Sequence, residues 1–178
     1  MSKEIELKYL VSKIPENFNE KIYIDQKYFN PKGKEEYLKS LFKDIDLNTI
    51  NTFRLRTITK NNKPTYILTL KSKGINYSRD EYEIEIDEKT YNLLNKDIES
   101  EIIKNRYIKL INNYKFEFDE YLNLKIKLIT LEVELETETN IEEDISKIET
   151  ILNKLNISFE NVTFDNRYKN SNLIKYFG

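Results

Sequence analysis

Charged and apolar residues alternate at the start of the chain. The stretch EIELKYL places Glu4, Glu6 and Lys8 on every second position, with Ile5 and Leu7 between them. In a β-strand, alternate side chains point to the same face of the sheet. Two carboxylates and an ammonium group would therefore share one face, and that face either meets water or lines a site.

Six further stretches repeat this spacing, and most carry charge of one predominant sign. Like charges two residues apart on a strand lie roughly 7 Å apart and repel unless an opposite charge lies between them. A solvated surface usually intersperses both signs. Segregated sets therefore favour a binding site. The sets are Arg54 and Arg56; Lys71 and Lys73; Arg79, Glu81, Glu83 and Glu85; Lys104 and Arg106; Glu117 and Asp119; and Glu132, Glu134 and Glu136.

The two kinds of charge suit two partners. Arg offers paired planar donors and Lys a mobile point charge, and both suit phosphate oxygens. Carboxylates in a chain without His or Cys suit oxygen-preferring Mg²⁺ or Mn²⁺. The absence of His and Cys also excludes zinc sites of the usual kind and a serine-histidine triad. If the charged faces line the inside of a barrel, they would enclose a polyanion bound with divalent metal ions.

The composition sets the class of protein. A chain of 178 residues is long enough for one domain with its own core, so we treat 1–178 as a single domain. Its net charge of −2 gives no strong field of one sign, and we expect neither a nucleic-acid nor a membrane partner. The start of the sequence lacks an apolar run, and with no Cys a cytoplasmic protein is the expectation.

Hydrophobic periodicity places the charges on strands. Eight stretches alternate with period two, which predicts an α+β fold: an eight-stranded antiparallel β-barrel with flanking helices, whose closure removes exposed strand edges. The predicted strands are 3–11, 22–29, 52–59, 65–73, 79–87, 101–111, 114–122 and 129–138. Helical spacing predicts a helix over 141–156, a weaker one over 88–96, and a loop with a short helix within 30–50. These helices are too few to cover eight strands, which leaves a homodimer open.

The ordered blocks resemble a known family. EIELKYL is followed by FRLRT, YILTLKSK, RDEYEIEI, IIKNRYI, KFEFDEY, LEVELE and TFDNRYKNSNL. This order resembles the CYTH superfamily, the triphosphate tunnel metalloenzymes, over nearly the whole chain. The final block is most similar to the short bacterial members that hydrolyse inorganic triphosphate. The resemblance implies an eight-stranded tunnel, a small triphosphate-containing substrate and a divalent metal.

The resemblance also implies roles for individual residues. It assigns phosphate binding to Lys8, Arg54, Arg56, Lys71, Arg79, Lys104 and Arg106, with Arg167 and Tyr168 in the segment that closes one end of the tunnel. The metal set is Glu4, Glu6, Asp119, Glu132 and Glu134, with Glu81 and Glu83 orienting cations or waters. Lys73, Glu85, Glu117 and Glu136 match the pattern less firmly. Gln26 and Tyr28 are interpreted as barrel packing and left out of the site.

The leading hypothesis is metal-dependent hydrolysis of inorganic triphosphate. Phosphoryl transfer to water needs positioning and charge neutralisation and no covalent nucleophile. The general base stays open between Lys8, with a pKa lowered among cations, and Glu6, as a carboxylate that orients a metal-bound water. The alternatives are a class IV adenylate cyclase, a thiamine or nucleoside triphosphatase, and a polyphosphate or nucleotide binder without turnover. A structural sheet domain with a wet charged face ranks last.

Overall fold

The computed structural model describes residues 2–43 and 45–178. The strands are β1 (Ser2–Val11), β2 (Glu20–Phe29), β3 (Ile50–Lys60), β4 (Lys63–Ser72), β5 (Ser78–Ile86), β6 (Ile98–Ile111), β7 (Tyr114–Tyr121), β8 (Ile129–Glu134) and β9 (Phe159–Asn161). The α-helices are α1 (Glu35–Leu41), α2 (Glu88–Leu94), α3 (Ile141–Lys154) and α4 (Leu173–Phe177), and short 3-10 helices span Leu47–Thr49 and Asn166–Tyr168.

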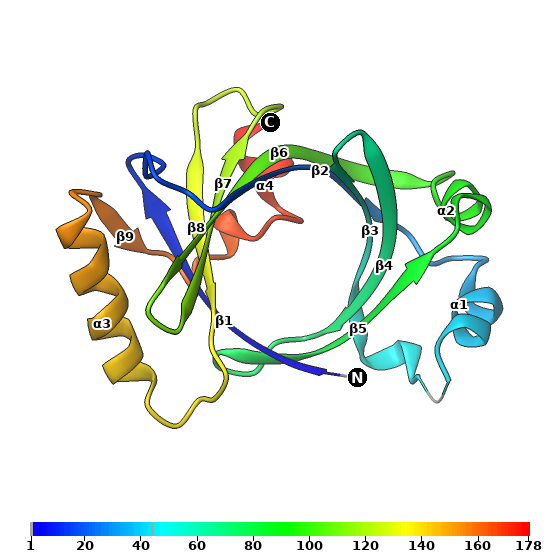
Figure 1. Ribbon diagram of the computed structural model, residues 1–178. Coiled ribbons are helices and arrows are strands. Elements are labelled where there is room, and N and C mark those ends of the chain that lie inside the picture. The colour runs from blue at the N-terminus through cyan, green and yellow to red at the C-terminus, as the bar shows by residue number, and fades with distance from the viewer. Residues whose placement is uncertain (1, 44) are drawn as a thin grey trace.

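Strands β1 to β8 close into a barrel in which every pairing between neighbours is antiparallel. The order is β5-β4-β3-β2-β6-β7-β8-β1, and the pairing of β5 with β1 closes the ring, while β9 adds beside the end of β1. Figure 1 shows this ring with α3 outside it on one side and α1 and α2 on the other. The predicted eight-stranded antiparallel barrel with flanking helices is confirmed.

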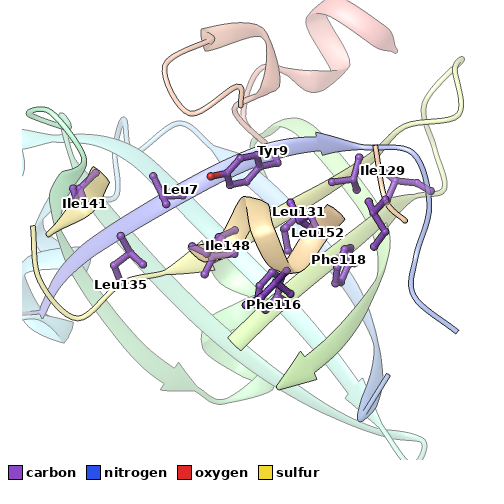
Figure 2. Packing of buried hydrophobic residues seen from close by; sticks show 14 of the residues in the cluster. Leu7, Tyr9, Phe116, Phe118, Ile129, Leu131, Leu135, Ile141, Ile148 and Leu152 are labelled. Atoms are coloured by element: carbon purple, nitrogen blue, oxygen red, sulfur yellow. The ribbon is translucent and has the colours of Figure 1, made fainter. Parts of the chain in front are cut away.

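The apolar residues between the charges form a core outside the barrel wall. Leu7 and Phe116 are fully buried under α3, where they pack with Ile148 and Leu152 of the helix (Figure 2). A second cluster, which includes Leu55, covers the outer face of β3 to β5 beneath α1 and α2. The hydrophobic core therefore lies between wall and helices, and the charged faces are left to the inside.

Asparagines make the tight hairpins that bring the strands together. The turn between β3 and β4 consists of Asn61 and Asn62, both with positive φ, at 49° and 60°. Two left-handed residues form the type I′ turn that matches the twist of paired strands, and Asn tolerates this conformation better than most residues. The turn fixes a register in which Arg56 lies opposite Ile67, so the charged positions of both strands face inward.

Two strands in the C-terminal part of the chain, β8 and β9, differ from the prediction. The last long strand was predicted over 129–138 but β8 ends at Glu134, so Glu136 lies outside it. The three-residue β9 was not predicted, since three residues carry no readable period. Helix α3 matches the predicted 141–156 closely. Among the helices of residues 2–43 and 45–178, none is long and apolar enough to cross a membrane.

The C-terminal segment packs against inward-facing residues near the end of the barrel. Leu173 of α4 is fully buried in a cluster with Ile102 of β6, Tyr121 of β7 and Leu128. Tyr168 and Phe177 pack against the same cluster. The polar and aromatic tail is thus an ordered cap, as its composition predicts.

Candidate functional site

The inward faces of the barrel enclose a charged cavity of about 910 Å³. The walls combine side chains from β1, β3, β4, β5, β6 and β8 with residues of the C-terminal segment. The sequence-predicted residues that line the cavity are Glu4, Glu6, Lys8, Arg54, Arg56, Lys71, Arg79, Glu83, Lys104, Arg106, Glu132 and Glu134. Lys73, Glu81 and Glu117 line it as well. Residues that span more than 120 positions of sequence are therefore gathered in one place.

Two predicted residues lie elsewhere. Asp119 is fully buried behind the wall, beneath Lys104 and Arg106, and is not among the lining residues. Arg167 lies outside the cavity with its side chain 57% exposed, and its guanidinium pairs with Asp165 at 2.5 Å. The structure therefore places Asp119 as a support for cations and Arg167 away from the phosphate-binding set.

Arg106 joins three carboxylates at the centre of the wall. Its Nε donates to Oδ1 of Asp119 at 2.7 Å, one terminal nitrogen donates to Oδ2 of Asp119 and to Glu132 at 2.6 and 2.5 Å, and the other pairs with Glu117. Burial lowers the pKa of Arg106, but these carboxylates outweigh burial and raise it well above its usual value. Burial likewise raises the pKa of Glu132, and Lys8 and Arg106 overcome this and hold it well below its usual range.

Lys104 lies beside an apolar layer inside the barrel, and its pKa is lowered whereas that of Arg106 is raised. Ile24 lies directly opposite Lys104 between β2 and β6, and cross-strand partners share a face, so Ile22, Ile24 and Ile108 fill the barrel interior beside the charges. All three are buried and none lines the cavity. Burial, followed by repulsion from Arg106, lowers the pKa of Lys104 to about 8, although its ammonium pairs with Asp119 at 2.6 Å.

Glu4 holds a second pair of cations together. The Lys71 ammonium donates to both of its oxygens at 2.7 and 2.8 Å, and Arg79 Nε donates at 2.6 Å. Burial raises the pKa of Glu4, but Lys71 and Arg79 outweigh this and lower it to about 2. Glu4 is therefore ionised at any ordinary pH, and it fixes two cations that point into the cavity.

Arg54 and Arg56 lie side by side on β3 and share the carboxylate of Glu83. Arg56 donates to Glu83 at 2.7 Å, and the guanidinium of Arg54 lies 3.5 Å from Glu83 and from Glu81. Among the described residues, the buried Nε atoms of both arginines have no hydrogen-bond partner. Burial, followed by repulsion from Arg54, lowers the pKa of Arg56 to about 10. An anion in the cavity would relieve this repulsion.

Of the acidic residues that line the cavity, Glu6 and Glu134 are the two without an ion pair among the described residues. They face each other as Cα partners across β1 and β8, and no ion pair to either is found in the described part of the chain. Burial, then the charges of Glu132 and Glu4, raise the pKa of Glu6 to about 8. Burial, then Glu4, Glu81 and Glu117, also raise the pKa of Glu134. The proximity of these negative charges would be relieved by a divalent cation.

The donor set fits a cation that is shared with a ligand. Within residues 2–43 and 45–178, no three carboxylates gather closely enough to hold a metal ion by themselves. Asp119, Glu132 and Glu83 are each held by Lys or Arg, so an ion there would have to displace a cation. Mg²⁺ commonly binds through one or two carboxylates together with phosphate oxygens. Glu6 and Glu134, with Glu4 nearby, match that kind of site.

Lys8 differs from the expectation drawn from the sequence. It was predicted to have a lowered pKa among cations, but it lies beside carboxylates: its ammonium pairs with Glu132 at 2.9 Å. Burial lowers the pKa of Lys8, and Glu132 and Glu6 more than reverse this, so the pKa is raised. That expectation is wrong, because the register across β1 and β8 sets Lys8 directly opposite Glu132.

Sequence reasoning left out several residues that the structure brings to the cavity. Gln26 donates to the hydroxyl of Tyr28 at 2.6 Å, and both line the wall. The sequence indicates both residues as barrel packing, whereas their two-residue spacing is the signal that sets them on the inward face. Thr163 and Asn170 also line the cavity, from a segment without strand periodicity, where no pattern in the sequence indicates the direction of a side chain.

Comparison with known proteins gives a match at the level of the family. The model of the CYTH domain matches residues 2–164. No curated protein matches the chain.

Solved structures share the fold over almost the full length. The inorganic triphosphatase NE1496 is 28% identical, with 98% of this chain and 95% of that chain covered and a TM-score of 0.53. The protein PH1819 from Pyrococcus horikoshii OT3 is 21% identical, with 97% and 98% covered and a TM-score of 0.66. The putative adenylyl cyclase HpAC1 from Hippeastrum, described as having a dominant triphosphatase activity, is 16% identical, with 97% and 95% covered and a TM-score of 0.66.

Proposed function

The chain belongs to the CYTH domain family, and on that premise we propose that it is a metal-dependent hydrolase of inorganic triphosphate. The substrate is a short chain of phosphates taken into the barrel, and the products are pyrophosphate and orthophosphate. The similarity to the inorganic triphosphatase NE1496, at 28% identity over nearly the whole of both chains, supports this choice of substrate.

One observation carries the proposal: the cationic side chains of five strands converge on one cavity. They are Lys8, Arg54, Arg56, Lys71, Arg79, Lys104 and Arg106. Arg54 and Arg56 repel each other and keep buried nitrogens without partners, which is a costly arrangement for a protein that binds no anion. A triphosphate supplies several anionic oxygens in a row and would satisfy these donors.

The carboxylates divide into two roles under this proposal. Glu4, Glu83, Asp119 and Glu132 fix the cations by ion pairs, and Glu6 and Glu134 would hold Mg²⁺ or Mn²⁺ together with substrate oxygens. The bound ion would polarise the phosphate oxygens as a Lewis acid. Glu4, Asp119 and Glu132 belonged to the metal set expected from the sequence, and Glu83 was expected to orient cations or waters. The proposal assigns all four to the cations that they contact.

The residues of the chain then contribute positioning and charge. The arginines fix the terminal phosphoryl group by paired hydrogen bonds, and Lys8 donates to it from a point held by Glu132. The negative charge that spreads over phosphate oxygens in the transition state is stabilised by these cations. Burial and neighbouring carboxylates raise the pKa of Glu6 to about 8, so without a bound cation its carboxyl group is mostly protonated at neutral pH. A divalent cation would favour the ionised carboxylate, and we assign that carboxylate to orienting the attacking water.

Arg56→Ala and a panel of substrates test the function. The wild type is expected to release orthophosphate from tripolyphosphate with Mg²⁺ or Mn²⁺, with little release from ATP, thiamine triphosphate or long polyphosphate. Arg56→Ala is expected to lose at least about a hundredfold in kcat/KM, because a removed donor to transition-state charge costs about 3 kcal/mol or more. Circular dichroism checks that the fold is retained.

Lys60→Ala is the matched control. Lys60 lies on the same strand as Arg56 with the same inward parity, but it pairs with Glu20 outside the cavity. It should hydrolyse tripolyphosphate at the wild-type rate. Formation of cyclic AMP and pyrophosphate from ATP would instead identify a cyclase, and tight binding of tripolyphosphate without turnover would identify a binding module.

A further inference from the structure

The segment after residue 164 contributes to the cavity although it lies outside the part of the chain that matches the family model. This segment, 165–178, contains a 3-10 helix and α4, and it docks through Leu173. Asn170 lies between the two helices, and its side chain reaches residues of β1, β7 and β8. These contacts join the C-terminal segment to the charged wall.

The amide of Asn170 contacts both members of the Lys8–Glu132 ion pair. Its Nδ2 donates to Oε1 of Glu132 at 3.0 Å, and its Oδ1 accepts from the Lys8 ammonium at 3.4 Å. The hydroxyl of Tyr121 donates to the same Oδ1 at 2.6 Å. The Tyr121 hydroxyl lies 3.0 Å from the Thr130 hydroxyl, which can donate to it.

Only one orientation of this amide satisfies its neighbours. A flipped amide would set its NH₂ group against the Lys8 ammonium and its oxygen against the Glu132 carboxylate, and both contacts would be repulsive. The Tyr121 hydroxyl can donate or accept, so the charges of Lys8 and Glu132 select the orientation. The network therefore fixes the direction of Asn170, and through it the positions of the ammonium and the carboxylate.

The backbone of Lys8 is held by the same part of the chain. Its N–H donates to Oγ1 of Thr163 at 3.0 Å, and its carbonyl accepts from the N–H of Val162 at 2.9 Å. Lys8 is thus fixed at its backbone by residues just before the C-terminal segment and at its ammonium by Glu132 and Asn170. A lysine side chain has four rotatable bonds, so anchoring both ends restricts the ammonium to few positions.

We propose that Asn170 is a positioning residue that fixes the Lys8 ammonium against Glu132 in the geometry needed for the phosphoryl group. This inference rests on the proposed function, since it gives Lys8 a phosphate oxygen to contact. Without Asn170, Lys8 keeps its charge and its ion pair with Glu132, so it still attracts the anion. Its ammonium is no longer held in one position. A displacement of about 1 Å can cost on the order of a hundredfold in rate.

Two substitutions test the proposal by kinetics. Asn170→Ala removes all three contacts, and Asn170→Asp keeps the shape and the acceptor but sets a carboxylate oxygen against Glu132. Both are expected to lower kcat by about 10- to 100-fold with KM changed less than about threefold, which marks an interaction used in the transition state. Lys175→Ala, at an exposed position of α4 whose ammonium faces the ring of Tyr176, should keep the wild-type kcat.

Leu173→Ala separates positioning from a merely structural role. It loosens the packing of α4 without removing a contact of Asn170. If Leu173→Ala lowers both Tm and kcat as much as Asn170→Ala does, the role is structural and the proposal fails. The proposal also fails if Asn170→Ala or Asn170→Asp keeps a kcat within twofold of the wild type.

A readout that needs no turnover keeps the test independent of the proposed function. In protein labelled with ¹³C at lysine Cε, the Lys8 signal is assigned by its loss in Lys8→Met. It should shift or broaden in Asn170→Ala and stay in place in Lys175→Ala. An unchanged Lys8 signal in Asn170→Ala would overturn the inference even if the enzyme is active, whereas a wild type that does not hydrolyse tripolyphosphate overturns only the proposed function.

Discussion

Glu6 on β1 and Glu134 on β8 lie directly opposite each other with their carboxylates on the cavity side of the barrel. Every other acidic residue at the centre of the wall is paired with Lys or Arg, as Glu132 is with Lys8 and Arg106. Burial, followed by repulsion from neighbouring carboxylates that include Glu4, raises the pKa of both groups, and solution measurements can detect this shift.

The pH dependence of stability should report on Glu6. Its pKa is about 4.5 when the chain is unfolded and about 8 when folded, so between these values the folded protein binds more protons. Stability in the presence of a chelator therefore falls as the pH rises from about 5 to 9, by an amount on the order of a few kcal/mol. Glu6→Gln should remove this fall in urea unfolding, whereas Glu142→Gln, exposed on α3, should retain it. Parallel curves for wild type and Glu6→Gln would contradict the assignment.

Tripolyphosphate should stabilise the folded protein. A ligand at about 100 times its Kd contributes about 2.7 kcal/mol, which for a chain of this length raises Tm by roughly 5 to 11 °C. The rise comes from the release of repulsion among cations such as Arg54 and Arg56. Differential scanning fluorimetry with a chelator present measures it, and Arg56→Ala should show a smaller rise. If sulfate at matched ionic strength gives the same increase, the cavity does not select a chain of phosphates.

Asp119→Asn should be strongly destabilising although Asp119 is not exposed to the cavity. It removes the charge that faces Lys104 and Arg106 in a buried position, and breaking such an arrangement from one side costs about 3 kcal/mol or more. Urea unfolding measures the loss. Glu143→Gln removes the pair with Lys147 on the exposed face of α3 and should leave the unfolding midpoint unchanged. Equal effects of the two substitutions would contradict the role given to the buried pair.

Lys104 should titrate far below an ordinary lysine. Burial and Arg106 lower its pKa to about 8, so in protein labelled at lysine Cε one signal should shift near pH 8 and be absent in Lys104→Met. Tripolyphosphate adds negative charge beside the ammonium, which favours the protonated form, and the pKa should rise on binding. The prediction fails if every lysine signal titrates above pH 10, or if the titration near pH 8 does not move with tripolyphosphate.

The barrel and most of the charged wall could be predicted because they rest on a local rule. Alternation fixes which residues share a face, so Arg54 with Arg56 and Lys104 with Arg106 could be grouped from the sequence. Gln26 and Tyr28 obey the same rule, but uncharged inward residues are more often barrel packing, and on that interpretation they were left out of the site. Asn170 lies in an irregular segment, and its direction depends on contacts with Lys8, Tyr121 and Glu132, which come from three distant strands and which no local pattern encodes.

The sequence by itself determined which stretches form strands, which residues of each strand share a face, and which of those faces carry positive or negative charge. It did so because side-chain direction in a strand repeats every two residues whatever the partner strand. The tertiary structure decided which charges are paired. The register of β1 against β8 sets Lys8 opposite Glu132 and Glu6 opposite Glu134, which raises the pKa of Lys8 and leaves Glu6 without an ion pair among the described residues. Register and burial are relations between distant segments, and electrostatic energies depend on those distances rather than on residue type.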